Sequence, residues 1–293
     1  MSAAASPRAA RPRVGADAIA GKGWLGAHKW LLLRRLSQLG ILALFLAGPW
    51  FGLWIVKGNL SSSLTLDVLP LTDPFLLAQS FATGTLPYKE ALIGAGIVVA
   101  FYLFVGGRVF CSWVCPMNLV TDAAAWLRRR LGLKGGKIPS ADTRYWLLGF
   151  MLIAAFATGS LVWEWVNPVS MLHRGLIFGF GLAWGIVGGV FLYDLLIATR
   201  GWCGHLCPMG AFYSLLGAAA LVRVSAAHRS ACDDCMDCFA VCPEPQVIRP
   251  ALKAAGQDHP VILDRNCTNC GRCVDVCGKN VFRITTRFDR SES

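Results

Sequence analysis

The residues of this chain whose type and spacing predict chemistry are its 12 cysteines. Near the C-terminal end, the spacing Cys-x2-Cys-x2-Cys-x3-Cys occurs twice. Three cysteines at this spacing wrap a loop around one [4Fe-4S] cubane, and the fourth reaches across to the other cluster. We therefore expect two [4Fe-4S] clusters close to one another. The predicted ligand sets are Cys232, Cys235, Cys238 and Cys277 for the first cluster, and Cys267, Cys270, Cys273 and Cys242 for the second.

Two other uses of these cysteines fit the spacing less well. A zinc ion takes four thiolates, and the third evenly spaced cysteine of each run has no role in such a site. Disulfides are not expected because the tail is predicted to face the reducing cytosol. The first run is followed by Pro243 and the second by Gly278. This departure affects the turn and leaves the ligands unchanged.

The remaining cysteines lie in an internal repeat. The segment RVFCSWVCPMN contains Cys111 and Cys115, and the segment RGWCGHLCPMG contains Cys203 and Cys207. Cysteines four apart lie on one face of a helix and can share a partner. Three interpretations stay open: two redox-active thiol pairs, one metal cluster held by all four cysteines, or buried inert thiols. We treat the four as candidate redox thiols.

The scaffold that holds these cysteines is predicted to be apolar. Mean hydropathy is +0.51, with 55% hydrophobic and 15% charged residues, which is too apolar for an ordinary soluble protein. Four uncharged runs are each long enough for a helix to cross a bilayer core of roughly 30 Å. We expect an all-α polytopic membrane protein with four transmembrane helices and a C-terminal two-cluster ferredoxin-like α+β domain. The runs cover residues 36–56, 91–107, 145–163 and 175–193.

Basic residues predict the orientation of these spans. The net charge is +11, and Lys and Arg concentrate before the first run and between the second and third runs. The positive-inside rule then places both termini in the cytoplasm. The charge is thus assigned to topology, and no nucleic-acid partner is expected. The predicted domains are a basic tail (1–35), a four-helix membrane domain (36–199) and a cytoplasmic cluster region (200–293).

Other electron carriers have no matching motif. There is no Cys-x-x-Cys-His, and every histidine lies outside the four apolar runs, so we expect no haem. No Walker A or Rossmann motif occurs, so we expect no nucleotide cofactor.

Across nearly its whole length the chain resembles the NapH type of membrane-bound quinol dehydrogenase component of periplasmic nitrate reductase systems. The segments that carry the resemblance are LLLRRLSQ, GPWFGLWIVKGN, PLTDP, FCSWVCP, WEWVNPVS, GWCGHLCP, CMDCFAVCPEP and CGRCVDVC. The methylamine-utilisation ferredoxin type shares this plan. The resemblance implies electron transfer from quinol to a periplasmic iron–sulfur protein, and then through a c-type cytochrome to nitrate reductase.

Quinol oxidation releases protons as well as electrons, so the site needs a proton acceptor in an apolar cleft. The candidates at the predicted membrane edges are Asp73, Glu164, His173 and Asp194, and we prefer Glu164. Two other functions stay open. The chain could be an assembly or maturation factor that reduces metal or thiols for a redox enzyme, or a structural membrane anchor for a partner.

Overall fold

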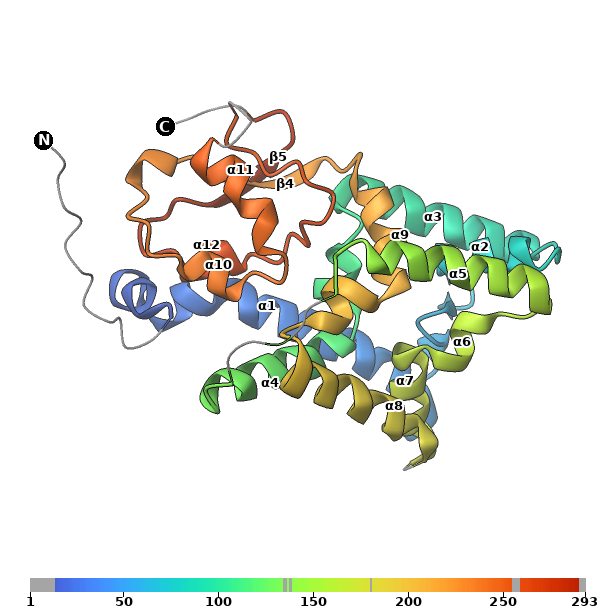
Figure 1. Cartoon of the computed structure of the whole chain (residues 1–293). Coiled ribbons are helices and arrows are strands. Elements are labelled where there is room, and N and C mark those ends of the chain that lie inside the picture. Colours follow the sequence, from blue (N-terminus) through green and yellow to red (C-terminus); the bar gives the residue numbers. More distant parts are fainter. Residues whose placement is uncertain (1–13, 134–135, 137–138, 180, 255–258, 290–293) are drawn as a thin grey trace, which may run out of the picture. The chain divides into compact units, whose positions relative to one another are not determined.

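The computed structural model describes residues 14–133, 136, 139–179, 181–254 and 259–289 (Figure 1). The chain divides into two compact units that do not follow chain order. Unit 1 contains the N-terminal segment up to Leu33, Val224–Ile262 and the segment from Gly271 onward. Unit 2 contains Arg34–Arg223 and Leu263–Cys270. The second cysteine run is therefore divided between the two units.

The four expected transmembrane helices are not all present. Among the described residues, only α1 (Ala16–Phe51) is long and apolar enough to cross a membrane. The other apolar runs form the shorter helices α3 (Lys89–Val105), α5 (Thr143–Thr158) and α8 (Leu182–Leu192). The structure also contains β-strands. The predicted four-span, all-α class is therefore wrong.

Glycines mark where two of these apolar runs leave the helical conformation. Helix α3 ends at Gly106, where φ is 116°, and α5 ends at Gly159 in the left-handed conformation. Glycine adopts positive φ without the Cβ clash of other residues and commonly ends helices. Hydropathy reports how apolar a segment is, but it does not report where the backbone leaves the helical conformation.

The segment between the first and second apolar runs begins with a small antiparallel sheet. Strands β1 (Val56–Gly58), β2 (Ser62–Thr65) and β3 (Leu69–Thr72) pair in chain order. Strand β3 packs against α3. Helix α2 (Pro74–Ala82) follows β3 directly.

The core of unit 2 lies among α2, α3, α5 and α9 (Pro208–Gly217), and α5 contacts both α2 and α9 (Figure 1). Its buried aromatic residues include Phe75, Phe110, Trp163 and Tyr213, and Cys115 belongs to the same cluster. The first Cys-x3-Cys-Pro motif is therefore part of the core. The remaining helices of unit 2 are α4 (Met117–Arg130), α6 (Val162–Val166) and α7 (Pro168–Phe178), and η2 (Tyr193–Ile197) is a π-helix.

Unit 1 contains short elements around the cysteine runs. Helix α10 (Asp237–Val241) packs against α12 (Arg272–Val276), one from each run. The 3₁₀ turn η4 (Arg229–Ala231) precedes α10 in the chain, and the 3₁₀ turn η5 (Pro245–Val247) and helix α11 (Ile248–Lys253) follow it. Strands β4 (Val222–Ser225) and β5 (Arg283–Thr286) form a two-stranded sheet.

The backbone at Gly107 lies close to the backbone of α9, and a substitution there tests this packing. A Cβ at Gly107 would lie 1.7 Å from the Tyr213 carbonyl oxygen, whereas one at Gly96 meets nothing within 4 Å. Gly107→Ala should lower the free energy of unfolding by about 3 kcal/mol or more, because the backbone segments must separate. Gly96→Ala, a helix-interior control, should be neutral or stabilising by up to about 1 kcal/mol. Chemical unfolding in detergent measures both, and equal stability of the two variants would contradict the packing.

Candidate functional site

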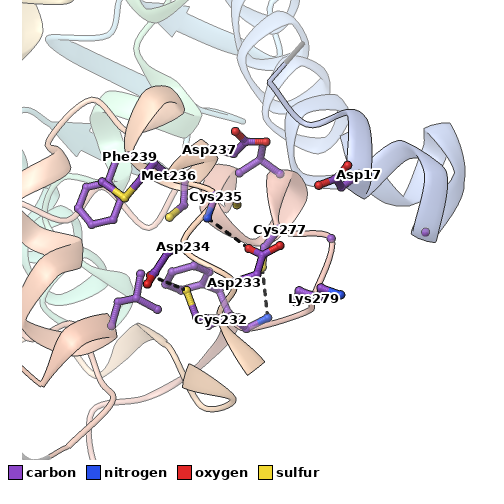
Figure 2. A pocket seen from close by; sticks show the side chains of 17 residues that line it. Asp17, Cys232, Asp233, Asp234, Cys235, Met236, Asp237, Phe239, Cys277 and Lys279 are labelled. Atoms are coloured by element: carbon purple, nitrogen blue, oxygen red, sulfur yellow. Dashed lines mark hydrogen bonds between the residues drawn. The ribbon is translucent and has the colours of Figure 1, made fainter. Parts of the chain in front are cut away.

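The four predicted ligands of the first cluster line one pocket in unit 1. The pocket has a volume of about 450 Å³, and its wall includes Cys232, Cys235, Cys238 and Cys277. Figure 2 shows Cys232, Cys235 and Cys277 among the residues around it. The sequence separates Cys277 from the other three, and the packing of α10 on α12 brings it back to them. The donor set, four thiols on one cavity, matches the ligand set of a [4Fe-4S] cluster.

The two cysteine runs share a local backbone pattern. Positive φ occurs at Asp234 and Met236 in the first run, and at Asn269 and Gly271 in the second. These residues occupy equivalent places, immediately before the second cysteine and immediately after it. Positive φ is uncommon for residues other than glycine and concentrates at functional sites. The repeated turn is therefore a property of the motif.

Hydrogen bonds hold two of the cysteines that line this pocket. The backbone N–H of Cys235 donates to Asp233 Oδ1 at 3.2 Å, and that of Val281 donates to Cys277 Sγ at 3.4 Å (Figure 2). Burial raises the pKa of Cys235, and it raises the pKa of Cys238 to about 12. Without a bound cation these thiols stay protonated at neutral pH. Metal binding to such groups therefore releases protons.

The loop that carries Cys267 and Cys270 is hydrogen-bonded to other segments of unit 2. Ser112 Oγ donates to the Thr268 carbonyl oxygen at 2.8 Å, and Trp113 Nε1 donates to that of Asn269 at 3.2 Å. The Asn269 side chain donates to the Val105 carbonyl oxygen at 3.1 Å. Burial raises the pKa of Cys267 to about 11. Cys242 and Cys273 belong to unit 1, so the ligand set of the second cluster stays a prediction from spacing.

The two Cys-x3-Cys-Pro segments have the same local fold. Each begins in a π-helix, η1 (Phe110–Val114) or η3 (Trp202–Leu206), and then turns into an α-helix at the proline. The N–H of Cys115 bonds the Phe110 carbonyl oxygen, and that of Cys207 bonds the Trp202 carbonyl oxygen, both at 2.9 Å. Single π-helical turns are rare and occur frequently at functional sites.

All four cysteines of the repeat line one chamber in unit 2, together with Met117 and Met209. The chamber has a volume of about 20 Å³, roughly the space needed by one water molecule. Burial raises the pKa of Cys115 and Cys203 well above the usual range, and that of Cys207 to about 12. The thiolate is the nucleophile in disulfide exchange, so such thiols are poor partners for it. They need a bound cation to become deprotonated.

Arg108 connects the two copies of the repeat. Its side chain is 1% exposed, and its guanidinium donates to the Cys203 carbonyl oxygen at 2.9 Å and to the Asn266 carbonyl oxygen at 3.0 Å. Arg144, also buried, donates to the Gly204 carbonyl oxygen and to Asn266 Oδ1, each at 2.7 Å. Both arginines lie in the basic segment between the second and third apolar runs. They hold the chamber against the loop of the second cysteine run.

Glu164, the preferred proton acceptor, lies in a polar network. It accepts hydrogen bonds from Ser61 Oγ at 2.9 Å, Asn167 Nδ2 at 2.8 Å and Ser170 Oγ at 2.9 Å. It lines neither the cysteine pocket of unit 1 nor the four-cysteine chamber of unit 2. Its role as proton acceptor stays a prediction.

The other two candidate acceptors are also buried. Asp194 accepts a hydrogen bond from the Trp202 N–H at 3.0 Å, and burial raises its pKa to about 7. Burial lowers the pKa of His173, which contacts Phe45 edge-on.

Three side chains that hold the site were not identified from sequence. Gln38 donates to the Ser112 carbonyl oxygen at 2.9 Å, and Asp122 forms ion pairs with Arg35 and Arg200. Tyr213 donates to Asp73 at 3.0 Å. Arg200 occupies the position in the second repeat that Arg108 occupies in the first. This correspondence is the one sequence signal for the ion pair between Arg200 and Asp122. Among the described residues, no group of three or more His, Cys, Asp or Glu is arranged to hold a single metal ion.

The paired cysteine runs and the four-cysteine pocket define a ferredoxin-type iron–sulfur protein. Comparison with protein families agrees: a 4Fe-4S dicluster domain matches residues 231–281, and a 4Fe-4S binding domain matches 90–134 and 178–224. The second of these covers both Cys-x3-Cys-Pro segments. The chain therefore carries two kinds of 4Fe-4S domain, one in the tail and one in the repeat.

The chain belongs to the family of NapH and MauN ferredoxin-type electron-transfer proteins, which confirms the resemblance seen in its sequence. It is 52% identical to ferredoxin-type protein NapH of Haemophilus influenzae, over 92% of this chain and 94% of that protein. It is 53% identical to methylamine utilization ferredoxin-type protein MauN of Methylorubrum extorquens, over 93% and 94%. The putative electron transport protein YccM of Escherichia coli is 26% identical, over 87% and 74%. No solved structure matches the chain.

The bonds of Arg108 can be tested by removing them. Arg108→Met should lower the free energy of unfolding by roughly 2–4 kcal/mol, because buried carbonyl groups lose a charged donor. Arg174→Met, at an exposed position of α7, is the control and should change stability by less than about 0.5 kcal/mol. Chemical unfolding in detergent measures both. An Arg108→Met variant as stable as the control would show that Arg108 does not hold the chamber.

Proposed function

We propose that the chain is a membrane-attached quinol dehydrogenase subunit that passes electrons from quinol toward a periplasmic nitrate reductase. The observation that carries this proposal is the single pocket lined by Cys232, Cys235, Cys238 and Cys277. Family membership supports electron transfer. The sequence resemblance to quinol dehydrogenase components supports quinol as the donor.

The tail residues are assigned to two clusters. Cys232, Cys235, Cys238 and Cys277 would hold one [4Fe-4S] cluster; Cys267, Cys270, Cys273 and Cys242 would hold the other. When bound, each cluster accepts and releases one electron at a time. Beside the first set, Lys22 Nζ donates to the Val274 carbonyl oxygen at 2.9 Å, and its charge interacts favourably with Cys277. This cation stabilises negative charge on the sulfur ligands.

The four chamber cysteines are proposed to form a third iron–sulfur site. Their convergence on one chamber supports a shared ligand, and so does the match of both segments to a 4Fe-4S binding domain. The alternative, redox-active thiol pairs, needs thiolates that burial disfavours. Because the chamber holds about one water molecule, loading must displace side chains. Met117 and Met209 line it and are flexible enough to move.

Membrane attachment is assigned to α1. Its apolar part is long enough to cross a bilayer, and Lys22 and Lys29 lie in its N-terminal part. The positive-inside rule favours the cytoplasm for that end. Unit 1 combines this N-terminal part of α1 with most of the cysteine-bearing tail, which supports a cytoplasmic cluster domain at the bacterial inner membrane.

The acceptor is proposed to be a periplasmic iron–sulfur protein, followed by a c-type cytochrome and nitrate reductase. This part rests on the sequence resemblance alone. The sequence identities to the NapH and MauN proteins are nearly equal, at 52% and 53%. The resemblance of the segments to the NapH type is therefore the basis for this choice of acceptor. The alternative of a thiol-reducing maturation factor is disfavoured by the burial of the chamber thiols.

Anaerobic reduction by a quinol analogue tests the function. Purified protein mixed with excess menaquinol or ubiquinol analogue should show the EPR signal of reduced [4Fe-4S] clusters, because the clusters are one-electron acceptors for quinol. Dithionite gives the total reducible signal as the control. A signal with dithionite and none with either quinol would contradict the quinol dehydrogenase role while leaving the clusters in place.

Loss of one ligand tests the first cluster. Cys235→Ala should remove about four iron atoms per chain, because one cubane loses a ligand while the other set stays complete. Ser230→Ala, an exposed position nearby, should keep the full iron content. Iron analysis after anaerobic purification measures both variants. Equal iron in Cys235→Ala and Ser230→Ala would exclude Cys235 as a ligand.

A further inference from the structure

A second large cavity lies in unit 2, beside the chamber. Its volume is about 440 Å³, within the usual range for small-molecule sites. Helices α1 and α3 contribute apolar side chains to its wall, such as Phe45 and Val98. The segment of the β1–β3 sheet contributes Leu60 and Leu71. An apolar cavity of this size accommodates an amphiphile with a ring and part of a hydrocarbon tail.

One carboxylate and one phenol stand in this apolar wall. Asp73 is 5% exposed, and its Oδ1 accepts a hydrogen bond from Tyr213 Oη at 3.0 Å. Both residues line the cavity. The same carboxylate caps α2 by accepting the Phe75 N–H at 3.2 Å. A buried carboxylate is costly unless it is partnered, so its position in a cavity wall marks a functional candidate.

The aromatic residues give the cavity a ring-binding wall. Phe110 stacks on Tyr213 with ring centroids 4.7 Å apart, and Tyr102 meets Tyr213 edge-on at 5.1 Å. Flat rings pack favourably against such groups. Phe110 also lines the four-cysteine chamber and directly precedes Cys111. The cavity and the chamber therefore share one side chain as a common wall.

We propose that this cavity binds the head group of a quinol, and that Asp73, held by Tyr213, accepts the proton of one quinol hydroxyl group. This inference rests on the quinol-oxidising function proposed above. In the step assigned to Asp73, the quinol O–H bond breaks and a carboxyl O–H bond forms. The products are a neutral Asp73 and the quinol monoanion, and no electron moves in this step.

The electrostatic environment of Asp73 supports this role. Burial raises its pKa to about 6, with a smaller rise from the charge of Glu164, while hydrogen bonds from Phe75 and Tyr213 act in the opposite direction. A base whose pKa lies near the working pH can both accept and release a proton. Glu164, by contrast, has its oxygens bonded to Ser61, Asn167 and Ser170.

The test separates binding from proton transfer. Asp73→Asn keeps the shape and a residue that caps α2 well, so the variant should fold. We expect its rate of quinol-dependent cluster reduction to fall at least 100-fold, while the dithionite-reducible signal stays unchanged. Tyr213→Phe should give a smaller loss. Asp67→Asn, an exposed residue paired with Lys57 near the same sheet, is the control and should match the unaltered protein.

Location is measured independently of activity. A photoreactive azidoquinone should label peptides from α3 or the β1–β3 sheet, and Val98→Phe, which fills the cavity, should reduce the labelling at least 5-fold. An unchanged rate of quinol-dependent cluster reduction in both Asp73→Asn and Val98→Phe would overturn the site while the proposed function stands. Labelling of other segments would do the same. If the unaltered protein is not reduced by quinol, the proposed function fails. Labelling that Val98→Phe abolishes would then still assign the cavity as a quinone-binding site.

Discussion

The structure of unit 2 depends on buried arginines that bond backbone carbonyl groups of distant segments. Arg108 joins the second Cys-x3-Cys-Pro segment to the loop at Asn266, and Arg144 bonds the same two places. A buried guanidinium without such acceptors would be strongly destabilising. These bonds therefore require the loop with Cys267 and Cys270 to pack on the chamber, and so join the repeat to the second cysteine run.

This constraint places two cavities and one cysteine loop next to one another within unit 2. The cavity of Asp73 and Tyr213 shares Phe110 with the chamber, and the chamber is bonded to the loop of Cys267. Phe110 connects the cavity to the chamber, and the hydrogen bond from Arg108 connects the chamber to the loop. The cavity proposed for quinol, the four-cysteine chamber and the loop with Cys267 and Cys270 are thus neighbours within unit 2.

Sequence predicted the chemistry better than the scaffold. The spacing of the cysteines pointed to four residues that the structure brings together, because Cys277 lines one pocket with Cys232, Cys235 and Cys238. Hydropathy was insufficient for the four spans, because Gly106 and Gly159 end helices inside apolar runs. The Asp73–Tyr213 pair could not be found from sequence. It joins residues far apart in the chain, and only Asp73 was among the candidates that the sequence indicated.

The content of iron and acid-labile sulfide per chain, measured after anaerobic purification, decides whether the chamber cysteines act together with the two tail sets. Three four-cysteine sites that each hold a [4Fe-4S] cluster give about 12 atoms of each element per chain. About 8 atoms of each would contradict an iron–sulfur site in the chamber and would leave Cys111, Cys115, Cys203 and Cys207 as thiols.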